Sequence, residues 1–144
     1  MRFRIVLASH GELAKGMFNT VQMLLGPQEN MTAYCLSPEQ DVEQFKEILR
    51  KEVEEHGAEN VIFMTELIHG SPFNSVVDMT RDMEIYHISG TNLPTLMGAV
   101  LARDEDDATA ESICEAAIEA SQQSIIDVRK MLAAADEDDE EEEF

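Results

Sequence analysis

His10 has the residue type and the position of a nucleophile. It follows a run of apolar and small residues, 4–9, and precedes Gly11. Histidine titrates near neutral pH, and its neutral imidazole is nucleophilic. A glycine at the next position permits a tight turn and leaves one side of the ring unobstructed. A histidine placed in this way can carry a covalently bound group.

Two later positions suit phosphate chemistry. Glu66 closes another apolar run, and a carboxylate that accepts from one imidazole nitrogen leaves the other nitrogen free to attack. Gly70 and Ser71, followed by Pro72, have the composition of a helix start, where free N–H groups and a partial positive charge bind phosphate. Each residue also has a plainer interpretation, Glu66 as a solvated loop acid and Ser71 as a helix cap only. Together with His10 they suggest a histidine that carries a phosphoryl group.

The remaining histidines divide by position. His69 directly precedes Gly70, so we expect a second imidazole near the proposed phosphate. His56, beside the helix-ending Gly57, and His87, within an expected strand, are most simply structural. The sequence has no Walker loop, no Asp-rich magnesium motif and no cysteine–histidine zinc pattern. We therefore expect chemistry that uses no metal and no cofactor.

Strand and helix patterns alternate along most of the chain and must position these residues. Hydrophobic periodicity predicts strands and helices in turn. The strands are expected over residues 4–9, 31–36, 61–65 and 84–89, and the helices over 13–25, 37–57, 71–83, 93–103 and 109–135. The second helix should begin with Ser37 as its N-cap, because Pro38 and Gln40 then occupy favourable first-turn positions.

Four strands, each followed by a helix, predict an α/β fold: a doubly wound, mostly parallel four-stranded sheet with helices on both faces. Ligands of such sheets bind at the carboxyl ends of the strands, near the switch point. We therefore expect the site in the loops after the first, third and fourth strands. If the first and third strands are neighbours, Glu66 can reach His10.

The charge of the chain is strongly negative. Among 144 residues there are 30 acids and 10 Lys or Arg, a net charge of −20. This charge disfavours nucleic acid and anionic membrane and favours a protein partner with a basic face. The eight acids of residues 136–144 should repel one another. We expect one domain over residues 1–135 and a disordered acidic tail over residues 136–144.

Cysteine usage and hydropathy point to the cytoplasm. Cys35 and Cys114 make no disulfide framework and are expected to be buried thiols in a reducing compartment. The apolar run at the start is too short for a signal peptide. No run approaches the ~18 apolar residues of a membrane span, so direct membrane insertion is not expected.

Five stretches, spread over most of residues 1–125, resemble the IIA component of the mannose-type sugar phosphotransferase system. They are residues 5–11 (IVLASHG), 23–30 (MLLGPQEN), 70–74 (GSPFN), 90–94 (GTNLP) and 102–106 (ARDED). The resemblance implies a phosphoryl carrier, which accepts phosphate from the phosphocarrier HPr on the histidine matching His10. It passes the group to a IIB component during sugar uptake, without a metal.

The resemblance also implies a homodimer, in which a short antiparallel strand from near the C-terminus joins the sheet of the partner. The sequence departs from the family in three places. The usual Asp at the end of the third strand is Glu66, and the usual Gly-Gly before Ser-Pro is His69-Gly70. The exchanged strand is not evident, because residues 124–131 are predicted to continue a helix.

Three other functions remain open at this point. Ser9-His10-Gly11-Glu12 is similar to the start of histidine phosphatases, but Ser9 replaces their arginine and the chain is short. The phosphoryl-donor subunit of dihydroxyacetone kinase has a related fold, with serine where Gly11 stands here. A regulatory binding module that has lost transfer would keep the fold but take up no phosphate.

Overall fold

The computed structural model describes residues 1–142 and contains a single four-stranded sheet. Its strands, in the order β2-β1-β3-β4, all run parallel. The elements are β1 (Arg4–His10), α1 (Leu13–Leu25), β2 (Met31–Leu36), α2 (Val42–His56), the 3₁₀ turn η1 (Ala58–Asn60), β3 (Val61–Thr65), α3 (Ser71–Met79), β4 (Tyr86–Ile88), α4 (Leu93–Arg103), α5 (Ala110–Ser121) and α6 (Val128–Glu142). The expected α/β class is confirmed, with a sheet that is parallel throughout.

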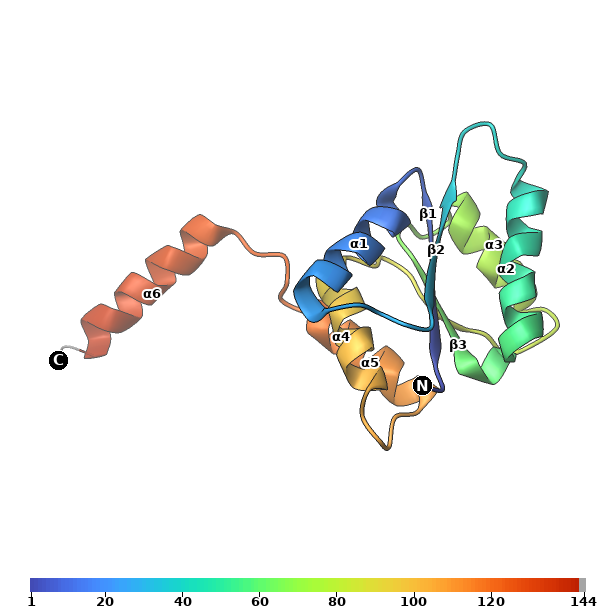
Figure 1. Ribbon diagram of the computed structural model, residues 1–144. Coiled ribbons are helices and arrows are strands. Elements are labelled where there is room, and N and C mark those ends of the chain that lie inside the picture. Colours follow the sequence, from blue (N-terminus) through green and yellow to red (C-terminus); the bar gives the residue numbers. More distant parts are fainter. Residues whose placement is uncertain (143–144) are drawn as a thin grey trace.

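Helices cover both faces of the sheet (Figure 1). Side chains alternate along β1, so Ile5 and Leu7 pack under α1, α4 and α5, while Val6 and Ala8 pack under α2 and α3. Both sets are buried, which explains why the sequence of β1 is continuously apolar. The doubly wound arrangement that the sequence predicted is therefore present.

The strands that follow β1 are added on opposite sides of it, and this defines the switch point of the sheet. The chain passes through α1 to β2 on one side of β1, and later through α2 to β3 on the other side. The switch point of the sheet thus lies between the carboxyl ends of β1 and β3. These ends carry His10 and Glu66.

A buried guanidinium joins the end of α4 to the amino-terminal end of β1 and β2, which is the end of the sheet opposite to His10. Arg103 is 5% exposed, and its Nη1 donates to the carbonyl oxygens of Phe3 and Asn30 at 3.2 and 2.8 Å. Its Nη2 donates to the carbonyl of Glu29 at 2.7 Å and to Oε1 of Gln28 at 3.1 Å. Burial lowers the pKa of Arg103, but a guanidinium stays charged at neutral pH. We call Arg103 and these four acceptors the Arg103 clamp.

The second helix starts later than the sequence predicted. It begins at Val42, and Asp41 is its N-cap, because the Asp41 side chain accepts from the backbone N–H of Glu43 at 3.0 Å. Residues 37–40 form a turn closed by a bond from Gln40 N–H to the Ser37 carbonyl. The prediction of Ser37 as the cap was therefore wrong, and the helix starts four residues later.

The C-terminal part also departs from the prediction of one helix over residues 109–135. Helix α5 ends at Ser121, and Gln123 has a left-handed backbone with φ of 64°. Residues 122–127 are not helical, and within them Ile125 is 88% and Ile126 51% exposed. Helix α3 likewise ends at Met79 rather than 83, and β4 begins at Tyr86 rather than 84.

The acidic segment is helical as far as the structure describes it. Helix α6 includes residues 136–142, for which the sequence predicted disorder; residues 143–144 lie outside the described part. Figure 1 shows α6 standing away from the rest of the domain, and every residue from 128 to 139 is exposed. Within residues 1–142, no helix is long and apolar enough to cross a membrane.

Deletion of residues 136–144 should leave the thermal stability of the domain nearly unchanged. Exposed side chains of residues 136–139 bury no apolar surface against the sheet, and like charges oppose compaction. We expect the midpoint of thermal unfolding to move by no more than about 2 °C, measured by circular dichroism. A fall of many degrees would show that the segment packs on the domain.

Candidate active site

His10 ends β1 at the exposed edge of the switch point. Its side chain is 46% exposed, although the preceding Ser9 is fully buried. The Ser9 hydroxyl accepts from the backbone N–H of Ala14 at 2.7 Å, which fixes the turn into α1. Gly11 adopts a left-handed φ of 57° and its N–H donates to the Leu36 carbonyl at 2.9 Å. The turn thus holds the imidazole at the surface.

Glu66 meets His10 with both carboxylate oxygens. Oε2 accepts from the backbone N–H of His10 at 2.7 Å, and Oε1 lies 3.4 Å from Nδ1 of the imidazole. Oε1 is buried and makes no hydrogen bond among the described residues, so the approach to Nδ1 is its nearest polar contact with the imidazole. The expectation that Glu66 reaches His10 is met, and the arrangement favours a proton on Nδ1. Nε2 is then the nitrogen that is free to react.

The start of α3 lies directly against the imidazole. A Cβ atom added to Gly70 would come within 2.6 Å of Cε1 of His10 and 3.4 Å of Nε2. The backbone does not require glycine here, since its φ of −71° suits any residue. The close approach of the His10 ring is what favours a residue without a side chain. Gly70 is also the N-cap of α3, where the sequence predicted Ser71, and no side chain caps this helix.

The first turn of α3 presents free donors next to Nε2. The N–H groups of Ser71 and Phe73 have no intrahelical acceptor, and Pro72 has no N–H. Ser71 lies with His10 in the wall of a hollow of about 330 Å³. A helix start with unpaired N–H groups beside a nucleophilic nitrogen can bind the oxygens of a phosphoryl group.

The loop after β2 forms the other wall of this hollow. The hollow as a whole is lined by His10, Gly11, Leu36, Ser37, Pro38, Gln40, Val42 and Ser71. Five of them, Leu36 to Val42, were not predicted, because we expected the site in the loops after β1, β3 and β4. The signal was present, since β2 is parallel to β1 and ends at the same edge. The loop after β4 contributes no lining residue. Its Thr91 N–H instead donates to the Thr65 carbonyl at 3.0 Å and so holds the end of β3.

His69, which we expected near the phosphate, packs against the side of α3. His69 has a left-handed φ of 69°, and its ring packs edge-on against Phe73 with centroids 5.6 Å apart. It is not among the residues that line the hollow. His56 lies 3.7 Å from Glu52 on α2, remote from the switch point.

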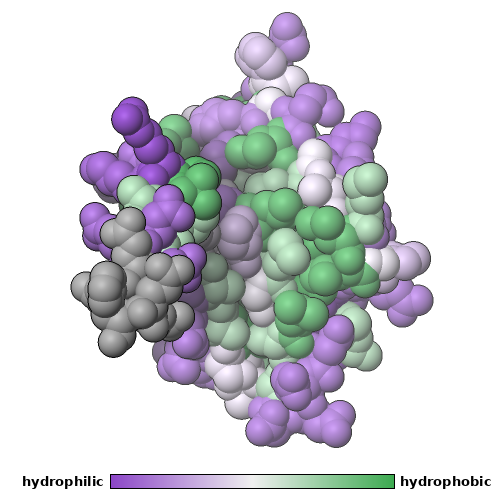
Figure 2. All heavy atoms as spheres, turned by 90° about the vertical axis from the view of Figure 1, so that its left-hand side faces the viewer, coloured by the Kyte–Doolittle hydropathy of each residue, from purple (hydrophilic) through white to green (hydrophobic). Residues whose placement is uncertain are grey.

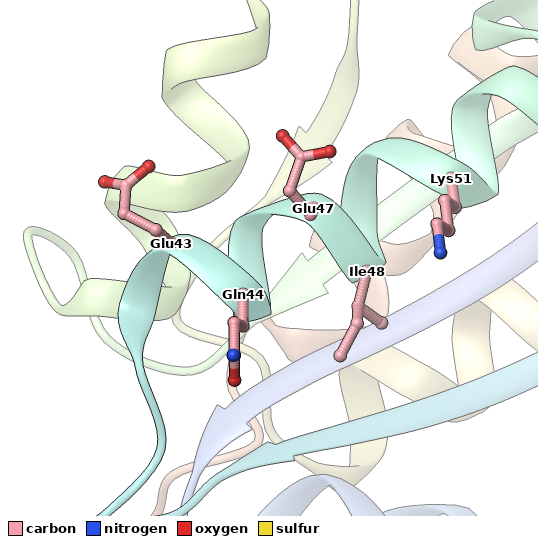
Figure 3. Close-up of a pocket in the computed structure, with 5 residues that line it drawn as sticks. All are labelled: Glu43, Gln44, Glu47, Ile48 and Lys51. Carbon is pink, nitrogen blue, oxygen red and sulfur yellow. The ribbon is translucent and has the colours of Figure 1, made fainter.

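A larger hollow, of about 450 Å³, lies on the outer face of α2 (Figure 3). It is lined by Glu43, Gln44, Glu47, Ile48 and Lys51, all from one helix. Figure 3 shows the two glutamates pointing to one side and the other three side chains to the other. It contains no histidine, and none of its lining residues belongs to the switch point. The smaller hollow at the switch point is therefore the candidate active site.

Comparison with known proteins decides the family. Residues 4–118 match the family EIIA-man, which is described as the fructose IIA component of the sugar phosphotransferase system (PTS). The chain belongs to this family. A relative from Escherichia coli K12, the PTS mannose-specific EIIAB component, is 31% identical over 127 residues. The match covers 87% of this chain but only 39% of that longer relative.

Other relatives of this IIA chain agree. The PTS sorbose-specific EIIA component of Klebsiella pneumoniae is 28% identical over 76% of this chain and 80% of its own length. The EIIA structure from Streptococcus agalactiae has a TM-score of 0.80, covers 89% of this chain and 98% of its own, and is 24% identical. The PTS IIA protein associated with a fucose utilization operon of Streptococcus pneumoniae has a TM-score of 0.78 and 25% identity, with 92% and 97% covered.

Proposed function

We propose that this IIA chain accepts a phosphoryl group from phosphorylated HPr on His10 and passes it to a IIB component during sugar uptake. The observation that carries the proposal is the position of the imidazole. Nδ1 faces the carboxylate of Glu66, and the other side of the ring lies against the N-terminus of α3. One side of the ring is thereby held and the other can receive phosphate. The negative net charge of the chain suits a carrier with a basic contact face.

The transfer needs only groups that the chain supplies. Nε2 of His10 attacks the phosphorus, and a new N–P bond forms as the bond between phosphorus and the donor histidine breaks. The imidazole becomes cationic, and the carboxylate of Glu66 stabilises this charge. The N–H groups at the start of α3, with Gly70 and Ser71, hold the phosphoryl oxygens. Delivery to IIB is the same step in the other direction: a histidine of IIB attacks the phosphorus, and the bond between phosphorus and Nε2 of His10 breaks. Neither transfer uses a metal or a cofactor.

Incubation with phosphorylated HPr tests the proposal directly. We expect the incorporation of one phosphate per chain and its loss on addition of a matching IIB component. Uptake without delivery to any IIB, but with delivery to a dihydroxyacetone kinase, would indicate the donor subunit of that kinase. No uptake would indicate a regulatory binding module. A panel of IIB components for mannose, sorbose, fructose and gluconate would identify the transport system that this chain serves. We place the chain itself in the cytoplasm, in association with the membrane components of that system.

Replacement of Glu66 by glutamine should slow phosphate uptake by about ten- to a hundredfold without abolishing it. Glutamine keeps the shape but removes the charge that stabilises the imidazolium, and a charge-assisted hydrogen bond contributes roughly 1.5–3 kcal/mol. Rapid-quench measurement of the rate gives the answer. Ser71→Ala is the comparison and should cost less, because the backbone N–H groups remain. An unchanged rate in Glu66→Gln would remove the role proposed for the carboxylate.

We also propose a homodimer, built through residues 122–127. This segment is not helical and exposes Ile125 and Ile126, and β4 leaves an open sheet edge. Figure 2 shows apolar side chains gathered on the side of the molecule from which α6 projects. Open edges and apolar patches of this kind are usually covered.

Sedimentation equilibrium at micromolar concentration should give about twice the chain mass of 16.1 kDa. The double variant Ile125→Ser, Ile126→Ser should sediment as a single chain, because it removes the apolar side chains of the segment. Exposed Val77→Ser on α3 serves as the control and should stay dimeric. A wild-type protein that sediments only as single chains would contradict the dimer.

A further inference from the structure

A partly buried polar cluster lies where β3 ends, one residue before Glu66. Thr65 is fully buried, and its Oγ1 lies 2.8 Å from Nε2 of His87 on β4. The same hydroxyl is hydrogen-bonded to Oγ of Ser89 at 3.1 Å. All other residues of β3 are apolar. A buried polar group of this kind is costly unless it is bonded, so the cluster fixes the relative positions of its members.

His87 is held within this cluster and is neutral. The Phe73 ring packs on it with centroids 5.2 Å apart. Burial lowers the pKa of His87 to about 4, so the imidazole carries no charge at neutral pH and each nitrogen acts either as a donor or as an acceptor. The last backbone pair between β3 and β4 is Met64 with Ile88, and the side chain of His87 extends the contact between the two strands to Thr65.

The placement of Glu66 depends on the contact between the Thr65 hydroxyl and His87. In the described part of the chain the Glu66 carboxylate accepts one hydrogen bond, from the His10 N–H to Oε2, while Oε1 lies 3.4 Å from Nδ1 of the same residue and makes none. Glutamate has one more rotatable bond than aspartate and loses more rotamer freedom when it is held in one geometry. Its aim therefore relies on a fixed backbone at Thr65, the residue to which it is directly bonded.

We propose that His87 is a positioning residue: through the Thr65 hydroxyl it fixes the end of β3 so that the Glu66 carboxylate meets Nδ1 of His10. The effect of His87 on the tautomer of His10 follows from the geometry alone. Its effect on the transfer rate rests on the proposed function. His87 does not touch the phosphoryl group.

Nitrogen-15 NMR of the unphosphorylated protein tests the geometry, because it reports which nitrogen of His10 carries the proton. In wild type we expect Nδ1–H, and in His87→Leu a shift towards the Nε2–H form. Thr65→Val, which removes the hydroxyl and keeps the shape, should give the same shift, and it carries the test if His87→Leu does not fold. His87→Gln, which offers an amide to Thr65, should restore the wild-type spectrum. Unchanged tautomers in folded His87→Leu or Thr65→Val would overturn the proposal.

A double-mutant cycle tests the path through Glu66. His87→Leu should slow phosphate uptake by about three- to tenfold, the effect of one neutral hydrogen bond. In a Glu66→Gln background it should cause no further loss. His56→Leu, at a histidine remote from the site, is the control and should leave the rate unchanged. Additive losses from His87→Leu and Glu66→Gln would overturn the proposal. Absence of any uptake in wild type would instead reject the proposed function, and the tautomer measurement would still decide the role of His87.

Discussion

Replacement of His10 by alanine should abolish phosphate uptake from phosphorylated HPr and leave the domain folded. His10 provides the nucleophilic nitrogen, and no other histidine lines the hollow. Its ring is nearly half exposed and outside the two apolar clusters of the core, so truncation to alanine removes little packing. Phosphate incorporation and circular dichroism, measured on the same sample, check both parts of the expectation.

His56→Ala is the matched control and should still take up one phosphate per chain. If His10→Ala also incorporates one phosphate, the assignment is wrong, and His69 becomes the next residue to test. In wild type, phosphorus–nitrogen NMR correlation should place the phosphoryl group on Nε2, the nitrogen turned away from Glu66. A correlation to Nδ1 would contradict the orienting role of Glu66 even with His10 as the acceptor.

Replacement of Arg103 by methionine should lower the free energy of unfolding by about 3 kcal/mol or more. Methionine fills part of the volume but leaves the carbonyls of Phe3 and Glu29 without the Arg103 donors, whereas the Asn30 carbonyl keeps the bond from the Ile5 N–H. Each buried unsatisfied group costs about 1–3 kcal/mol. A domain of this size has about 5–15 kcal/mol in total, so the loss is a large fraction. Urea unfolding should show a lower midpoint with an unchanged slope.

Arg81→Met is the control for the Arg103 clamp. The Arg81 side chain is 81% exposed and lies 3.8 Å from Asp78, so its loss should change stability by no more than about 0.5 kcal/mol. Phosphate uptake by folded Arg103→Met should stay near the wild-type rate, since the clamp lies at the end of the sheet opposite His10. An unchanged urea midpoint in Arg103→Met would show that the clamp contributes little to stability.

The elements with a clear hydrophobic pattern were predictable, because hydrophobic periodicity records burial. Helices α1 and α4 and strands β2 and β3 span the residues that the sequence predicted. The approach of Glu66 to His10 was predictable for the same reason. Parallel strands bring their carboxyl ends to one edge, and only the neighbouring order of β1 and β3 had to be assumed.

What the sequence did not reveal depends on contacts between distant residues. The contact of Gly70 with the His10 ring joins segments 60 residues apart, and the composition of neither predicts it. The start of α2 was misplaced because Ser37-Pro38 and Asp41 are both acceptable helix starts, and the structure uses Asp41. The break after Ser121 interrupts a helical pattern without a Gly or Pro, so no local signal marked it.

The projecting helix α6 affects how the size of this protein is measured. A compact body with a charged rod attached has more friction with the solvent than a sphere of equal mass, and repulsion among the acids keeps the rod extended. Gel filtration calibrated with spherical standards will therefore assign a single chain too large a mass, in the direction of a dimer. The retention volume should increase at high salt and after deletion of residues 136–144, whereas the mass from light scattering should follow only the number of associated chains.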